Sequence, residues 1–362
     1  MGENTVSSFD IKRFIVNTVN DLEKIKSIWK ELEKGPEMTV FQSYDWNVLL
    51  YREESRKKFF SLFTDMVIYL LKLGESYEVM LPVIIQKHTN ETKWFGRKKG
   101  IYIWGDGSYS DYLSAIYSVN ATSEEFSAII ERIKFDYQKM PIFFNDIREF
   151  NRFSNYLTEK AIRVIKQDVS VQVEMTLLRE EYEKSLSKSV RQNIRTAKNR
   201  MMKAGLDYRI EICGKIDDES LIEKLTEIHI ARMTQKNTNK VDLVHAMSSY
   251  VRIKYRTNRE KNNNIISESM KVMDNSCLVI CYLNNDIAGY LYGLIDRDTI
   301  RIMQNCVKED YKFYSPMFRG AYDFILMQYD NDDIKIVDFT RGNEQYKYNL
   351  GGVEIQLKSY EI

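Results

Sequence analysis

Two segments of the 362-residue sequence have the pattern of β-hairpins, and they constrain the fold more than any other feature. Residues 65–88 (DMVIYLLKLGESYEVMLPVIIQKH) form an apolar run, a Gly-Glu-Ser turn and a second apolar run. Residues 277–307 (CLVICYLNNDIAGYLYGLIDRDTIRIMQNCV) repeat the pattern with an Asn-Asn-Asp turn and add a third run after Arg297-Asp298. Apolar runs separated by such turns are typical of antiparallel hairpins. Their repetition predicts a duplicated α/β domain.

The length of the chain also indicates two domains, because one domain takes about 150 residues. Apolar residues make up 44% of the sequence, which is enough for two cores, and no Pro-rich or Gly/Ser-rich linker is visible. We therefore predict an N-terminal domain over residues 1–165 and a C-terminal domain over residues 166–362, packed against each other. The expected class is α/β (α+β), with a mixed, mostly antiparallel twisted sheet flanked by helices in each domain.

Charge and cysteine content exclude several classes of protein. The net charge of +1, from 53 basic and 52 acidic residues, argues against a general nucleic-acid binder. The four cysteines form no CxxC pair and the three histidines lie far from them in sequence, so we expect neither a metal site nor a disulfide framework. The N-terminus lacks the apolar segment of a signal peptide, and no apolar run reaches the roughly 18 residues of a membrane span. We expect a cytoplasmic monomer or homodimer.

Residues 184–203 contain seven basic residues and no acidic one. Ser189 is the expected cap of a helix that ends at Gly205, and Arg191, Arg195 and Lys198 share one face of it. This face is either simply solvated or binds the phosphates of a cofactor or substrate; both interpretations stay open. The apolar residues of the helix recur at helical spacing: Val190, Ile194, Ala197 and Met201.

A strand that ends at Val307 is followed by a polar loop and by a helix from about Pro316 to Tyr329. Proline is favoured in the first helical turn, and amides at a helix N-terminus bind phosphate oxygens. The pattern is compatible with a pyrophosphate-binding turn, but it is weak alone because two glycines of such turns are absent. The candidate cofactor-binding residues here are Lys312, Phe313, Ser315, Met317, Phe318 and Arg319.

Polar residues gather after the next strand, IKIVDF, which carries Asp338 at its end. A turn follows, and Tyr346, Lys347 and Tyr348 are expected to start a final strand. A lone Asp at a strand end is most often a turn cap, and a Tyr-Lys-Tyr run is most often an edge strand. The order of hairpin, strand, phosphate-like turn, helix, strand, Asp and Tyr-Lys makes these residues candidates for a catalytic site.

This order resembles the GCN5-related N-acetyltransferase (GNAT) superfamily, and more specifically its two-domain branch related to the Fem-type peptidoglycan aminoacyltransferases. The most similar subgroup is that of acetyltransferases from cellulose and other polysaccharide biosynthesis clusters. Three segments carry the resemblance, in the family's order: FQSYDWNVLL (residues 41–50), SKSVRQNIRTAKNRMMKAG (187–205) and DFTRGNEQYKYNLGG (338–352).

The resemblance implies tandem GNAT-like domains, the first on the acceptor side and the second on the acyl-CoA side. It implies acyl transfer from acetyl-CoA or another acyl-CoA, without a metal, to an amino group of a sugar, a sugar nucleotide or a polysaccharide precursor; O-acyl transfer stays open. The superfamily's cofactor loop reads Gln/Arg-x-x-Gly-x-Gly/Ala, whereas this chain has Lys312, Ser315 and Met317 at the matching positions. Met317 is expected to crowd a diphosphate there.

Such a reaction assigns a role to each candidate residue. Backbone N–H groups between Asn305 and Val307 would stabilise the oxyanion of the thioester carbonyl. Asp338 would accept the proton of the attacking amine, and Tyr346 (or Tyr348) would protonate the leaving thiolate. By analogy with Fem-type relatives, Lys347 would neutralise a phosphate of the donor or stabilise the charge that develops at the donor site.

The acceptor is expected between the domains, as a small molecule or a glycan and not DNA. Gln42, Tyr44 and Trp46 have the chemistry of a sugar-binding surface, or else begin a helix that packs on the core. The loop from Trp104 to Ser114 either lines the acceptor cleft or is a plain connection. The candidate residues of this loop are Asp106, Asp111 and Tyr112. In the basic helix, Arg191 and Arg195 would hold the diphosphate if the acceptor is a nucleotide sugar.

Two alternatives to this function stay open. One is an aminoacyl-tRNA-dependent Fem-like transferase, although the polar, Asn-rich stretch from Thr234 to Met273 resembles a flap more than a tRNA-binding helical arm. The other is a non-catalytic module that binds a glycan or a partner protein. Binding of coenzyme A distinguishes both alternatives from the acyl-CoA-dependent enzyme.

Overall fold

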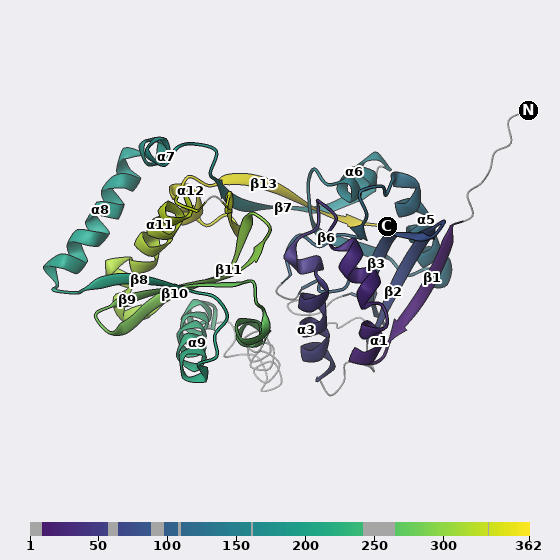
Figure 1. The fold of residues 1–362 in the computed structure, drawn as a ribbon, viewed down its shortest axis with the longest axis horizontal. Coiled ribbons are helices and arrows are strands. Elements are labelled where there is room, and N and C mark those ends of the chain that lie inside the picture. The colour runs from purple at the N-terminus through teal and green to yellow at the C-terminus, as the bar shows by residue number, and fades with distance from the viewer. Residues whose placement is uncertain are drawn as a thin grey trace, which may run out of the picture. The chain divides into compact units, whose positions relative to one another are not determined.

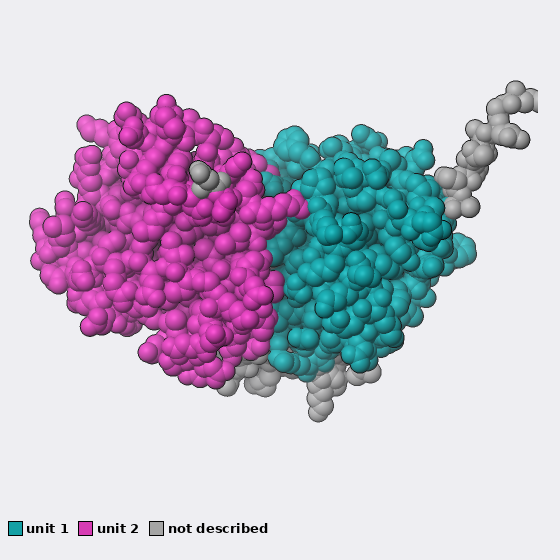
Figure 2. All heavy atoms as spheres, viewed as in Figure 1, with its two compact units in different colours: residues 1–168, 356–362 teal, residues 169–355 magenta. Residues whose placement is uncertain are grey.

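The computed structural model describes residues 9–56, 64–87, 98–107, 110–160, 162–241, 265–331 and 333–362. The chain divides into two compact units (Figure 2): unit 1 comprises Met1–Asp168 and Gln356–Ile362, and unit 2 comprises Val169–Ile355. The return of residues 356–362 to the first unit was not part of the expected domain arrangement. Both units are mixed α/β, with mostly antiparallel strands flanked by helices (Figure 1).

The sheet of unit 1 has the strand order β1-β2-β3-β4-β6, with the end of β13 beyond β6 and β5 paired with β3. The first predicted hairpin is confirmed, because β2 and β3 pair antiparallel from Thr64↔Gln86 to Leu73↔Ser76. Within the described part of unit 1, β4 and β6 form the parallel pair. The strands are β1 (Asp10–Val16), β2 (Thr64–Leu73), β3 (Ser76–Gln86), β4 (Gly100–Ile103), β5 (Ile116–Tyr117), β6 (Ile142–Arg148) and β13 (Val353–Glu361).

Helix starts in unit 1 follow from capping residues. Ser43 accepts a hydrogen bond from the Trp46 amide at the start of α3, and Thr122 and Glu125 form a capping box at the start of α5. The helices are α1 (Val19–Glu23), α2 (Lys26–Leu32), the 3₁₀ helix η1 (Val40–Gln42), α3 (Tyr44–Ser55), α5 (Ser123–Asp136) and α6 (Arg152–Glu159).

The sheet of unit 2 has the order β7-β12-β11-β10-β9-β8. The second predicted hairpin is confirmed as the antiparallel pairs β9–β10 and β10–β11, and β11–β12 is the parallel pair. The strands are β7 (Arg163–Glu174), β8 (Tyr208–Cys213), β9 (Ser276–Leu283), β10 (Asp286–Asp296), β11 (Thr299–Val307) and β12 (Ile336–Arg341).

Helices lie on both faces of this sheet (Figure 1). One face carries α7 (Arg179–Ser185), α8 (Lys188–Lys203), the 3₁₀ helix η2 (Glu309–Tyr314), α11 (Pro316–Gln328) and α12 (Gln345–Asn349). The other face carries α9 (Glu219–Val241) and the helical residues 265–272. The flap predicted from Thr234 to Met273 thus begins and ends in helix, and its middle, residues 242–264, lies outside the described residues.

Two local predictions in unit 2 were wrong. Ser187, not Ser189, caps α8, since its hydroxyl accepts from the Val190 amide. Residues 345–349 form the short helix α12 and not the start of a strand, because the chain turns at Gly342 (φ 114°) and strand pairing resumes only in β13. The predicted end of α8 is confirmed: Gly205 has a φ of 65°, which glycine adopts at little cost.

Candidate active site

The central feature of unit 2 is the separation of its two parallel strands. β11 and β12 pair over three positions, Thr299↔Ile336, Ile300↔Val337 and Arg301↔Asp338. Among the described residues this ladder goes no further, and β12 continues its pairing with β7 instead. In the described part of the chain, the carboxyl-terminal half of β11 therefore has no pairing with β12.

A β-bulge at Met303 decides which side chains of β11 face α11. Tyr292 of β10 lies opposite Gln304 and Gly293 lies opposite Ile302, so Met303 is an extra residue in β11. An extra residue reverses the alternation of side chains along a strand. Ile302 before the bulge and Val307 beyond it consequently both contact the α11-side core, and Asn305 shares the face of Val307. Neither a turn residue nor a glycine marks the position of this bulge at Met303 in the sequence.

Tyr346 of α12 meets Asn305 on this face of the sheet. Its phenol hydrogen-bonds to the Asn305 side chain, and its ring packs edge-on against Phe339 with centroids 5.8 Å apart. Burial raises the pKa of Tyr346 to about 12, and the hydrogen bond from Asn305 only partly offsets this effect. The phenol is therefore neutral at physiological pH and can donate a hydrogen bond.

Asp338 lies in an ion-pair network on the opposite face. The neighbours Val337 and Phe339 belong to the α11-side core, so the Asp338 side chain points to the α9 side. Its Oδ2 lies 2.7 Å from a guanidinium nitrogen of Arg301, its Oδ1 accepts from the Thr340 amide at 2.8 Å, and the residue is 1% exposed. This geometry favours a structural role as counter-ion of Arg301; the role as general base stays a prediction.

Arg301 was missed in the sequence, although it carried a signal. It is a charged residue inside the apolar run TIRIM, and a buried charge requires a partner. In the structure it bonds Asp296 at 2.9 Å as well as Asp338, and both pairs are almost fully buried. The network joins β10, β11 and β12 at the point where β11 and β12 separate.

Lys347 is buried beneath the turn that follows β12. Its ammonium donates to the carbonyl oxygens of Thr340 (3.1 Å), Arg341 (3.0 Å) and Gly342 (3.0 Å) and pairs with Glu344 at 2.9 Å. Thr340 and Gly342 both have positive φ, 54° and 114°, so the lysine stabilises an unusual backbone turn. The contacts favour this structural role, and the predicted contact with a phosphate stays untested.

The start of α11 differs from the expected crowded loop. Ser315 is left-handed (φ 51°) and makes no side-chain cap, and Pro316 is the first helical residue. Met317 is 4% exposed and points into the core against Gly289, where an added Cβ would lie 2.6 Å from its Cγ. The amides of the first turn, at Met317 and Phe318, therefore face no methionine side chain.

The charged and aromatic candidates around this turn make their own contacts. Lys312 forms an exposed ion pair with Glu309 at 3.3 Å. Phe313 is 66% exposed and lies under the guanidinium of Arg200, 4.7 Å from its ring centroid. Arg319 pairs with Asp323 through two nitrogens, each at 2.7 Å.

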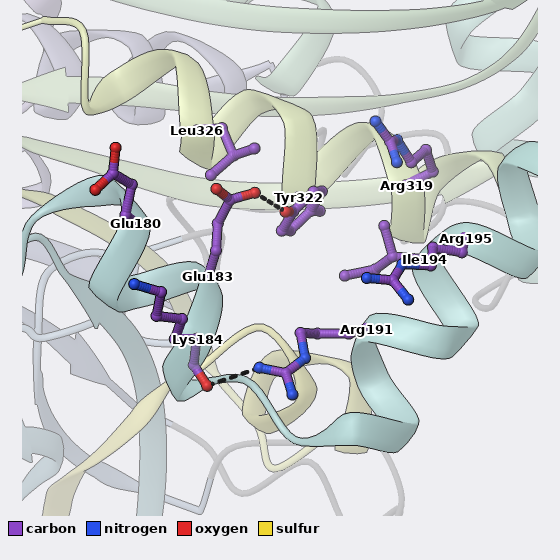
Figure 3. A pocket seen from close by; sticks show the side chains of 9 residues that line it. All are labelled: Glu180, Glu183, Lys184, Arg191, Ile194, Arg195, Arg319, Tyr322 and Leu326. Atoms are coloured by element: carbon purple, nitrogen blue, oxygen red, sulfur yellow. Dashed lines mark hydrogen bonds between the residues drawn. The ribbon is translucent and has the colours of Figure 1, made fainter.

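Arg191 and Arg195 meet in a pocket of about 690 Å³ between α7, α8 and α11, which we call the α8 pocket (Figure 3). Arg191 donates to the Lys184 carbonyl at 2.9 Å, and Tyr322 donates to Glu183 at 2.6 Å. Burial and this carboxylate raise the pKa of Tyr322. The lining residues are Glu180, Glu183, Lys184, Arg191, Ile194, Arg195, Arg319, Tyr322 and Leu326.

The three acceptor candidates near the start of α3 are buried in unit 1. Gln42 donates to the Tyr112 carbonyl at 2.9 Å, and the Trp46 indole donates to the Ser110 hydroxyl at 2.7 Å. Gln42, Tyr44 and Trp46 are each 3% exposed or less. These contacts favour the alternative in which the segment packs on the core, because no ring face is open to a sugar within the unit.

The loop candidates differ in exposure. Tyr112 is 2% exposed, with a φ of 56° and the guanidinium of Arg148 5.6 Å from its ring centroid. Asp106 and Asp111 are partly exposed, and Asp106 accepts from the Asn145 amide at 3.2 Å. Residues 108–109 of this loop lie outside the described residues. An acceptor role for Asp106 and Asp111 stays a prediction.

The described part of the chain shows neither a membrane-spanning helix nor a group of side chains suited to a metal ion. None of its helices is both long and apolar enough to cross a membrane. Nor do three or more His, Cys, Asp or Glu side chains of the described residues gather in a group suited to a metal ion.

Comparison with known proteins matches residues 188–348 to the family described as acetyltransferase (GNAT) domain. A conserved protein of unknown function from Bacteroides thetaiotaomicron VPI-5482 is similar in structure, with 12% identity, a TM-score of 0.50, and coverage of 96% of this chain and 98% of that one. FemX follows with 9% identity, a TM-score of 0.48 and 96% coverage of both chains. A tandem GNAT protein from the clavulanic acid biosynthesis pathway has 8% identity, a TM-score of 0.47 and 98% coverage of both.

No curated protein sequence matches the chain. The matched range contains β11, α11, β12 and most of α12, so the separated strands, Tyr346 and the start of α11 lie inside the part of the chain that is similar to a GNAT acetyltransferase domain. The likeness to the Bacteroides protein shows a shared fold.

Proposed function

We propose that the protein is an acyltransferase that takes an acetyl group from acetyl-CoA and transfers it to an amino group of a sugar, a sugar nucleotide or a polysaccharide precursor. One observation carries this proposal: within the range similar to a GNAT domain, β11 and β12 separate beside a partly buried neutral tyrosine and the start of a helix that has no side-chain cap. The acceptor class rests on the sequence resemblance.

The start of α11 supports a diphosphate site. The Ser315 side chain makes no cap, so the amides of Met317 and Phe318 can donate to phosphate oxygens at the positive end of the helix dipole. Met317 suits this role despite its size, because its side chain is turned into the core against Gly289. The donor would then lie on the α11 face of the sheet.

The separation of β11 from β12 supports the chemical step. A backbone N–H between Asn305 and Val307 would hold the thioester carbonyl and stabilise the oxyanion formed when the amine attacks. Collapse of the tetrahedral intermediate forms the amide, breaks the C–S bond and releases the thiolate. Tyr346, positioned by Asn305, would stabilise this thiolate by donating a hydrogen bond.

The amine approaches from the opposite face in this proposal, where Asp338 points. Both oxygens of Asp338 are engaged by Arg301 and the Thr340 amide, so it would accept the amine's proton through a water molecule. Lys347 acts indirectly, by fixing the turn that leads from β12 to Tyr346.

Calorimetric titration with acetyl-CoA tests the proposal, with the melting temperature measured in parallel. We expect saturable binding and a rise in melting temperature, because a ligand that binds only the folded state stabilises it. No binding at millimolar acetyl-CoA would contradict the proposal and favour an aminoacyl-tRNA-dependent or non-catalytic protein.

A further inference from the structure

The charges of the α8 pocket are not balanced within it. Lys184 and Arg195 have no ion-pair partner among the described residues, and Arg191 donates only to a backbone carbonyl. Arg319 is neutralised by Asp323. The two carboxylates of the pocket come from α7, and Glu183 already accepts from Tyr322. The wall formed by α8 is therefore cationic, with Arg191 and Arg195 on it (Figure 3).

The position of the pocket connects it to the donor and not to the acceptor. Ile194, Tyr322 and Leu326 belong to the same core cluster as Val307 and Tyr346, so the pocket lies on the α11 face of the sheet. Asp338 and Arg301 point to the opposite face. Arg319, the fourth residue of α11, places one edge of the pocket within a turn of the amides proposed for the diphosphate.

We propose that the α8 pocket binds the adenosine 3′-phosphate end of the acyl-CoA donor, through Arg191 and Arg195. This inference rests on the proposed function, and it moves both arginines from the acceptor to the donor. Coenzyme A carries a diphosphate and a separate 3′-phosphate, and a guanidinium binds a phosphate through paired N–H groups. Ile194, Tyr322 and Leu326 give the apolar contact that the adenine requires.

Calorimetry with two donors tests the inference: acetyl-CoA, and 3′-dephospho-acetyl-CoA, which lacks only the phosphate in question. We expect the wild-type protein to bind acetyl-CoA about tenfold more tightly, as a charge-assisted phosphate contact implies. Arg191→Gln/Arg195→Gln should bind both donors with the same, weaker affinity. Lys198→Gln is the matched control, because Lys198 is an exposed cation of α8 outside the pocket, and it should keep the preference.

Each other outcome has a distinct meaning. Equal affinities in the wild-type protein, or a preference that survives the double substitution, would overturn the inference while the proposed function stands. A higher acceptor KM in the variant with unchanged donor discrimination would return the arginines to the acceptor. If neither donor binds the wild-type protein, the proposed function itself fails. Should the double variant not fold, Arg195→Gln alone tests the same point, because Arg195 has no ion-pair partner among the described residues.

Discussion

The ammonium of Lys347 is surrounded by three carbonyl oxygens and a carboxylate. Replacing this lysine shows whether it stabilises the fold or contacts the donor. Lys347→Met keeps the side chain's length but leaves these buried acceptors without a donor. We expect the free energy of unfolding to fall by about 3–5 kcal/mol, because breaking a buried charged contact exposes the full desolvation penalty. Urea denaturation measures this change.

Lys312→Met is the control at the surface. Both side chains of its ion pair with Glu309 are at least half exposed, so we expect a change below about 0.5 kcal/mol. A Lys347→Met protein with unaltered stability but no acetyl-CoA binding would show that Lys347 contacts the donor, as the sequence resemblance predicts.

Tyr346→Phe tests the proposed role of the Tyr346 phenol as hydrogen-bond donor to the leaving thiolate. We expect turnover to fall about 10- to 100-fold, within the usual range for one acid–base group, while the Kd for acetyl-CoA stays unchanged. Steady-state kinetics and calorimetry together give both quantities. Wild-type turnover in the variant would remove Tyr346 from the mechanism.

The pH dependence of stability gives an independent check on Tyr346. Burial raises its pKa from 10.0 to about 12, so the folded protein holds the phenolic proton more tightly than the unfolded chain. The resulting stabilisation is complete below pH 10 and is lost as the pH rises through 12. Tyr346→Phe should therefore lose stability with pH less steeply than the wild type between pH 10 and 12, as urea denaturation at each pH would show.

At the scale of elements, the contact between α11 and β10 depends on Gly289. A Cβ at this position would lie 2.4 Å from the Cys306 carbonyl oxygen and 2.6 Å from Met317 Cγ. We expect Gly289→Ala to destabilise the protein by about 1–3 kcal/mol through overpacking. It should also weaken acetyl-CoA binding, because it displaces the start of α11. Thermal denaturation and calorimetry measure the two effects.

Gly320→Ala is the matched control within α11. The nearest atom to its new Cβ is 3.8 Å away, so alanine's higher helix propensity should stabilise the protein by about 0.5–1 kcal/mol. Adding Met317→Ala to Gly289→Ala should recover part of the loss, because two of the three close atoms belong to Met317. No recovery would place the strain at the Cys306 carbonyl alone.

Elements were predictable from sequence where local signals decide them. An apolar run predicts the end of β11 at Val307, a proline predicts the start of α11 at Pro316, and a glycine, Gly205, predicts the end of α8. The bulge at Met303 and the helix α12 depend on tertiary pairing, and no local pattern marks them. The candidate site was less predictable, since the burial of Lys347 depends on a turn formed seven residues earlier.

At the scale of the whole molecule, unit 1 is discontinuous in sequence. Residues 356–362 come after all of unit 2 but belong to unit 1, where Leu357 pairs with Arg148 and Tyr360 with Phe144 of β6. Leu357 and Tyr360 are fully buried. Hydrophobic periodicity predicts a strand here but contains no information about which strands it pairs with, so the boundary near residue 165 was expected to be the only one.

Deletion of residues 356–362 tests this arrangement. It removes the β6 partner and two core side chains, so we expect unit 1 to lose hydrogen-exchange protection by about 3 kcal/mol or more, the usual cost of large buried deletions. Protection in β9, β10 and α8 should persist, because none of their pairing uses these residues. Lys358→Gln, which removes only the surface ion pair with Glu149, should leave both units protected. Equal loss of protection in both units would instead show that they unfold as one cooperative body, and the donor site could then not be studied apart from unit 1.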